Sequence, residues 1–196
     1  MKSIEENVRA AHTFLSKHYG NASDSEIILV GFSRGALTAR VLAALINDVG
    51  LLSEKGLRHH ELIFTHWAAR RQQWKDEPEN DRLVVEAIRK RFAPDTFLFQ
   101  DGRQIHIKAV AVWDTVQSLG WKQVFQNVLP WLATEGEEQR FAFVRNRLPS
   151  NVENAFQALA LNEHRRNFQA VIWDAEGAAS SLMKQCWFAG YHSDPA

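Results

Sequence analysis

The feature that most constrains the fold is a serine flanked by two glycines, in the pattern Gly31-Phe32-Ser33-Arg34-Gly35. Residues 27–30 before it are apolar and largely β-branched, which predicts a buried strand. Residues 36–47 after it are rich in Ala and Leu, which predicts a helix. A Gly-x-Ser-x-Gly pattern between a strand and a helix is typical of a nucleophile elbow, although a plain Gly-Ser turn is the alternative. We expect glycines in this turn because side chains at Gly31 and Gly35 would collide with the neighbouring strand and helix.

Composition excludes several classes of protein. The 196 residues favour one domain, and 23 basic side chains balance 23 acidic ones, so no charge pattern indicates nucleic-acid binding. The single cysteine, Cys186, excludes an internal disulfide and a cysteine-based metal site. The polar, acidic N-terminus does not resemble a signal peptide, and no apolar run is long enough to span a membrane. We therefore expect a cytoplasmic protein that needs no cofactor or metal.

The hydrophobic pattern predicts several further elements. The expected helices are 4–19, 57–74, 81–91 and 152–162, and the expected strands are 97–100, 105–112 and 182–188. Residues 117–147 are predicted to be mostly irregular. The region of about 53–94 reads as surface helices, with a lid over the active site as the alternative. Its histidines, His59, His60 and His66, lack the spacing and the carboxylate of a zinc site.

Two further polar residues follow predicted strands. Asp114 comes just after one apolar strand and His192 just after the last one. Functional groups gather at the carboxyl ends of strands in open α/β sheets, and Ser, Asp, His is the chain order of α/β-hydrolases. Histidine can take the proton of the Ser33 hydroxyl, and an aspartate can orient the histidine. A turn or helix cap is the alternative role for Asp114, and Asp174 is the alternative acid.

The backbone N–H of Arg34, at the start of the predicted elbow helix, would stabilise an oxyanion with help from the helix dipole.

Four segments of the chain together resemble a known family. They are residues 31–40, 112–116 with Gly120, 158–166 with Phe168 and Trp173, and 185–194. The chain is similar to domain of unknown function 2235, an α/β-hydrolase family that includes the catalytic domain of one class of type VI secretion phospholipase effectors.

The resemblance implies Ser33 as nucleophile, Asp114 as acid and His192 as base. It also implies an α/β-hydrolase-like fold in one domain, residues 1–196, with a mostly parallel central sheet flanked by helices. Members of the family usually begin with a strand carrying Asp-Gly-Thr, which supplies the second oxyanion donor, and continue beyond His-Ser-Asp with Val-Gly-Gly-Gly. Neither is present here, and Asn162 stands where Asp is usual. We therefore expect a domain truncated at both ends that lacks its N-terminal strand or strands.

Three functions follow as hypotheses. The first is a serine hydrolase of lipid or small-molecule esters that works through an acyl-enzyme. The second is a truncated, catalytically impaired chain that acts as a binding module or is inactive alone, because an oligomer or partner chain could cover the exposed sheet edge. The third, a nucleotide-binding domain, is disfavoured because the chain contains neither glycine-rich phosphate-binding motif.

Overall fold

The computed structural model describes residues 3–20, 25–73, 78–115, 141–144, 146–165, 170–174 and 182–192. The helices are α1 (Ile4–His18), α2 (Arg34–Val49), α3 (Glu54–Leu57), α4 (His60–Gln73) and α5 (Pro78–Arg91), with short 3-10 turns at Pro94–Thr96 and Ala142–Val144. The strands are β1 (Ile28–Phe32), β2 (Ala109–Trp113), β3 (Asn154–Ala160) and β4 (Leu182–Phe188). This is the predicted α/β class.

The four strands form one all-parallel sheet in the order β1-β2-β3-β4. Phe32 at the end of β1 pairs with Trp113 at the end of β2, and Trp113 pairs with Ala158 near the end of β3. The carboxyl ends of the strands therefore meet along one edge of the sheet. This is the edge where parallel sheets of this kind gather their functional groups.

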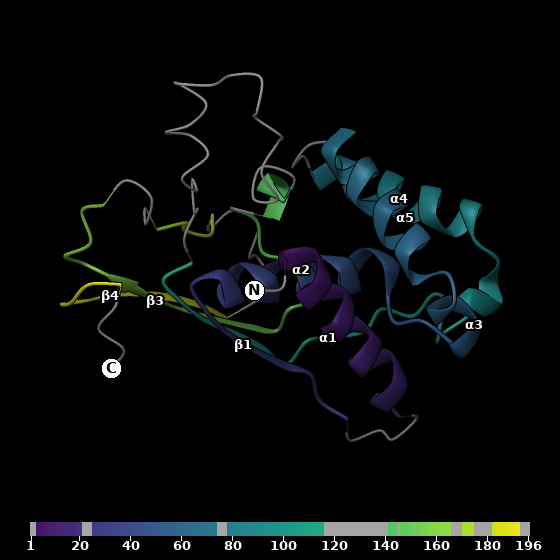
Figure 1. Cartoon of the computed structure of the whole chain (residues 1–196), viewed down its shortest axis with the longest axis horizontal. Helices are drawn as coiled ribbons and strands as arrows, with labels where there is room; N and C mark the ends of the chain where they lie inside the picture. Colours follow the sequence, from purple (N-terminus) through teal and green to yellow (C-terminus); the bar gives the residue numbers. More distant parts are fainter. Residues whose placement is uncertain are drawn as a thin grey trace.

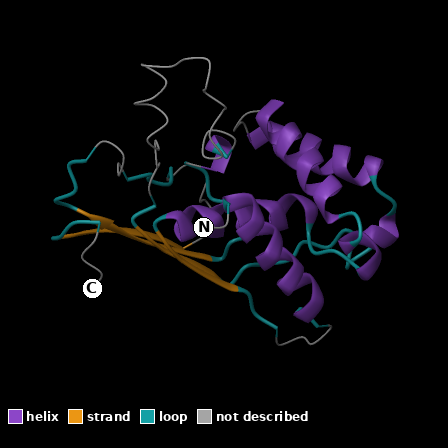
Figure 2. Ribbon diagram, in the orientation of Figure 1, coloured by secondary structure: helices purple, strands orange, loops and turns teal. Residues whose placement is uncertain are grey.

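Helix α2 packs on one face of the sheet, and the other described helices lie on the same side of the sheet as α2 (Figure 1 and Figure 2). Helix α1 begins with a capping box, in which the Ser3 hydroxyl accepts the Glu6 N–H and the Glu6 carboxylate accepts the Ser3 N–H. Helix α2 presents small and branched apolar side chains that pack against β1 and β2. Because residues alternate across a strand, Leu29 is buried beneath α2, whereas Val30 on the opposite face is 64% exposed.

The opposite face of the sheet carries exposed apolar side chains along all four strands. In the described part of the chain they include Ile28, Val30, Phe32, Trp113, Phe156 and Phe188. Parallel sheets are normally covered on both faces. The described residues therefore leave one face of this sheet open.

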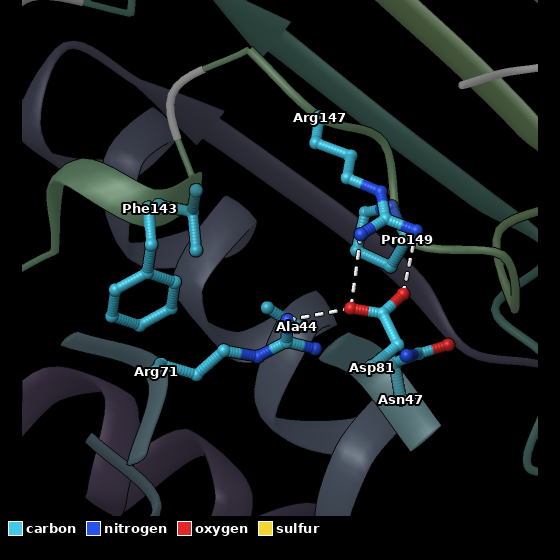
Figure 3. A pocket seen from close by; sticks show the side chains of 8 residues that line it. Ala44, Asn47, Arg71, Asp81, Phe143, Arg147 and Pro149 are labelled. Carbon is cyan, nitrogen blue, oxygen red and sulfur yellow. Dashed lines mark hydrogen bonds and ion pairs between the residues drawn. The ribbon is translucent and has the colours of Figure 1, made fainter. Parts of the chain in front are cut away.

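Helices α4 and α5 pack on the same side as α1 and α2, around the fully buried Phe64 and Trp67. Arg71 of α4 donates through Nε to the buried Asp48 of α2 at 2.6 Å. Figure 3 shows Arg71 and Arg147 both reaching Asp81 of α5 across a small hollow, at 2.6 Å and 2.9 Å. Removing one partner of a buried ion pair costs about 3–5 kcal/mol, so this cluster ties α2, α4 and α5 together.

The helices predicted at 57–74 and 81–91 are confirmed as α4 and α5, and the strand predicted at 182–188 is confirmed as β4. In Figure 1, α3–α5 lie at the end of the molecule away from β4. A lid role for the region of about 53–94 stays a prediction. In the described part of the chain, no helix is long and apolar enough to cross a membrane.

Two predicted elements are wrong. The helix predicted at 152–162 is strand β3, in which residues 155, 157 and 159 are buried, as expected for alternation across a sheet. The strand predicted at 97–100 is absent: Phe97 makes an isolated bridge to Leu52, because a 3-10 turn at 94–96 redirects the chain. Most of the region 117–147, predicted to be irregular, lies outside the described residues.

One histidine of the helical region, His60, takes a structural position beside His12 of α1. His60 contacts the buried His12, with Nε2 and Nδ1 3.0 Å apart, and the other ring nitrogen of His12 lies 2.8 Å from Gly50 O. Burial lowers the pKa of His12 to about 4 and the pKa of His60 to about 3, so both rings are neutral at pH 7. Within the described ranges, no three His, Cys, Asp or Glu side chains gather in a group that could hold a metal ion.

Candidate active site

Ser33 lies in a strained turn between β1 and α2. Its φ and ψ are 55° and −118°, a conformation that residues with a side chain rarely adopt. The Ser33 N–H donates to Trp113 O at 3.0 Å, and Ser33 O accepts from the N–H groups of Ala36 and Leu37 in the first turn of α2. These bonds hold the hydroxyl above the end of the sheet. Such a turn is the geometry of a nucleophile elbow.

The two glycines of the elbow differ in whether the structure requires a glycine at that position. A Cβ at Gly31 would lie closer than 3.0 Å to the carbonyl of Gly35 and to the N atom of Ala36, a spacing that Cβ atoms essentially never show. Glycine is therefore required at position 31. A Cβ at Gly35 would meet no described atom within 4 Å, so the predicted collision at Gly35 is wrong. Gly35 is exposed on the first turn of α2, which leaves room for a side chain there.

Asp114 is held at the carboxyl end of β2. Its N–H donates to Ala158 O at 2.9 Å, and its Oδ1 accepts the Ala160 N–H at 2.6 Å. Its φ is 39°, in the left-handed region that Asp tolerates better than most residues. In the described part of the chain, Ser33 and Asp114 are the non-glycine residues with positive φ. Backbone strain of this kind gathers at functional sites.

His192 brings the three strand-end residues together. Its Nε2 lies 2.9 Å from Ser33 Oγ, although 159 positions separate the two residues, and its Nδ1 lies 3.6 Å from Asp114 Oδ2. The second distance is longer than an ordinary hydrogen bond, and the Asp114 carboxylate would form an ion pair with this ring once His192 is protonated. The imidazole stacks on the Phe32 ring, with centroids 4.9 Å apart and planes inclined by 22°. The alternative acid, Asp174, donates its N–H to Asn146 O, and no described contact brings its carboxylate to His192.

The electrostatics of the site keep His192 neutral near pH 7. The residue is 8% exposed, and burial lowers its pKa below the usual 6.5, while the Asp114 carboxylate opposes this shift. A neutral imidazole with Nε2 facing a hydroxyl can accept a proton from it. The backbone N–H of Arg34 lies in the first turn of α2, where the helix dipole favours negative charge.

Sequence reasoning missed the residues that hold His192. Asn162 and Glu163 follow β3 and contact the segment that carries the histidine, and Phe32 contacts its ring. The prediction of a helix at 152–162 placed Asn162 and Glu163 at a helix end. Had this segment been read as a strand, its two following polar residues would have fallen on the same sheet edge as Ser33 and Asp114.

An α/β fold with a parallel sheet and a Ser-His contact at the carboxyl ends of its strands is an arrangement described for α/β-hydrolases. The family model described as "T6SS, Phospholipase effector Tle1-like, catalytic domain" matches residues 1–195. The chain belongs to this family, as its motifs had suggested.

One curated relative is an uncharacterized protein of Saccharomyces cerevisiae, YEL023C. It is 32% identical over 123 residues, which cover 60% of this chain and 16% of the yeast protein. The chain therefore corresponds to a small part of that relative. No solved structure matches the chain.

Proposed function

We propose that the chain is a serine ester hydrolase with a Ser-Asp-His triad. Ser33 is the nucleophile, His192 is the general base, and Asp114 is the acidic residue whose carboxylate stabilises the protonated histidine. The contact of 2.9 Å between His192 Nε2 and Ser33 Oγ carries the proposal, because it is the geometry that general-base activation of a hydroxyl requires. Membership in a phospholipase-like family of catalytic domains supports ester hydrolysis and favours phospholipids as one substrate class.

In the proposed reaction, Ser33 Oγ attacks the ester carbonyl carbon while its proton passes to His192 Nε2. The negative charge that forms on the carbonyl oxygen is stabilised by the Arg34 N–H and the dipole of α2. Collapse of the intermediate breaks the ester C–O bond, and His192 returns the proton to the departing alcohol. A water molecule then repeats the sequence on the acyl-enzyme and releases the acid, while Asp114 stabilises the imidazolium in both steps.

Hydrolysis assays test this proposal. We expect the purified chain to release acid from a p-nitrophenyl ester or from phosphatidylcholine vesicles, and Ser33→Ala to abolish release while keeping the wild-type circular dichroism spectrum. Comparing the two substrates separates a small-ester hydrolase from a lipid hydrolase. Activity that persists in Ser33→Ala would reject Ser33 as the nucleophile.

The second candidate is a hydrolase-like chain that is not active alone. The apolar face of the sheet that the described residues leave open favours it, because parallel sheets are normally covered on both faces. Folded wild-type protein that hydrolyses neither substrate would support this candidate over the first.

A further inference from the structure

The segment that carries His192 is fastened to the turn after β3. Leu161 N–H donates to Phe188 O at 2.8 Å, and Asn162 N–H donates to Gly190 O at 3.0 Å. Gly190 N–H in turn donates to the side-chain oxygen Oδ1 of Asn162 at 2.9 Å. Gly190 has a φ of 140°, in the region that favours glycine, so the chain can turn sharply there. These bonds direct the chain beyond β4 back over the end of the sheet.

Glu163 makes the next contact along the same turn. Its Oε2 accepts the backbone N–H of His192 at 3.4 Å, and both carboxylate oxygens are held by the Arg165 guanidinium at 2.9 Å and 2.6 Å. The Glu163 side chain is only 5% exposed, whereas that of Arg165 is 54% exposed. Arg165 lowers the pKa of Glu163 to about 2, so the carboxylate stays ionised at any pH where an ester hydrolase would work.

The geometry points to Asn162 and Glu163 as positioning residues that fix the turn carrying His192 and so place its imidazole against Ser33. This inference rests on the proposed function for its catalytic consequence. A base displaced by about 1 Å can lose a hundredfold in rate, so the hydrogen bonds that set its position matter to catalysis.

The charges around the imidazole make the role of Glu163 measurable. Asp114 faces His192 from the end of β2, and Glu163 and Arg165 face it from the turn after β3. The two carboxylates raise the pKa of His192, whereas Arg165 and burial lower it. Neutralising Glu163 or Arg165 singly should therefore move that pKa in opposite directions. A residue that merely stabilised the fold would not produce such a pair of shifts.

The first experiment measures the His192 pKa by NMR titration of the imidazole in the full chain, with His192→Gln used to assign the signal. We expect Glu163→Gln to lower the pKa and Arg165→Gln to raise it, with Arg165→Lys close to wild type. Shifts in the same direction, or no shift in either variant, would overturn the role of Glu163. Because this readout needs no turnover, it decides the question even if the chain hydrolyses no ester.

The second experiment compares Asn162→Ala with Asn162→Asp. The alanine variant loses the acceptor for the Gly190 N–H, so we expect kcat on a p-nitrophenyl ester to fall about tenfold with KM little changed. The aspartate variant keeps an acceptor oxygen, so kcat should stay within about twofold of wild type. Wild-type kcat in Asn162→Ala would reject the role of Asn162. Inactive wild-type protein would instead reject the proposed function. The positioning role would then be tested by the titration and by a structure of Asn162→Ala, in which we expect the His192–Ser33 contact to be lost.

Discussion

Replacing Gly31 with alanine should disrupt the elbow, because the added Cβ would overlap backbone atoms of Gly35 and Ala36. These atoms belong to the first turn of α2, so the overlap cannot be relieved by rotating a side chain. Overpacking of this kind costs about 1–3 kcal/mol, and we expect the upper end of that range. With a urea dependence of about 2 kcal/mol per M, a loss of 3 kcal/mol lowers the midpoint of unfolding by about 1.5 M.

The matched control is Gly35→Ala, since no described atom lies within 4 Å of the added Cβ. Alanine favours the helix over glycine by up to about 1 kcal/mol, so the midpoint should stay equal or rise by up to about 0.5 M. Urea unfolding followed by circular dichroism measures both variants against wild type. Equal losses in the two variants, or a wild-type midpoint for Gly31→Ala, would refute this account of the elbow.

Three further predictions concern charge and pH. Asp114→Asn should lower kcat for ester hydrolysis roughly 10³-fold or more while the protein stays folded, and unchanged kcat would exclude the acid role. Since burial lowers the pKa of His192 and the base must be neutral, kcat/KM should rise with pH through a midpoint below 6.5; a midpoint above 6.5 would contradict that burial effect. His12 and His60 are neutral in the fold with lowered pKa values, so the unfolded chain binds more protons below pH 6.5. Urea midpoints should therefore fall as the pH drops from about 6.5 towards 4, and midpoints independent of pH would show that these rings gain protons without unfolding.

The sequence predicted the elements whose signals are local. β1 is an apolar run, β4 is a largely apolar segment followed by Gly190, and α2 follows the elbow directly. β3 was missed because Ala and Leu in 152–162 favour a helix in isolation. Pairing with β2 on one side and β4 on the other selects the strand, and such pairing leaves little trace in a single segment.

The candidate site was predictable to a similar degree. Ser33, Asp114 and His192 were found because each follows an apolar strand, and parallel strands end at a common edge. The ion-pair distance of Asp114 and the stacking of Phe32 depend on side-chain conformations that a pattern of residue types does not encode. The fastening of the His192 segment by Asn162 depends on the register between β3 and β4, which also becomes visible only in the fold.

If the chain is a serine hydrolase, His192 must activate Ser33 as a nucleophile. The most direct measurement is the site of covalent labelling by a fluorophosphonate, located by mass spectrometry of the digested protein. We expect one adduct, on the peptide that contains Ser33, and little or no labelling in His192→Ala. Folded wild-type protein that remains unlabelled, or an adduct on another serine, would contradict this expectation.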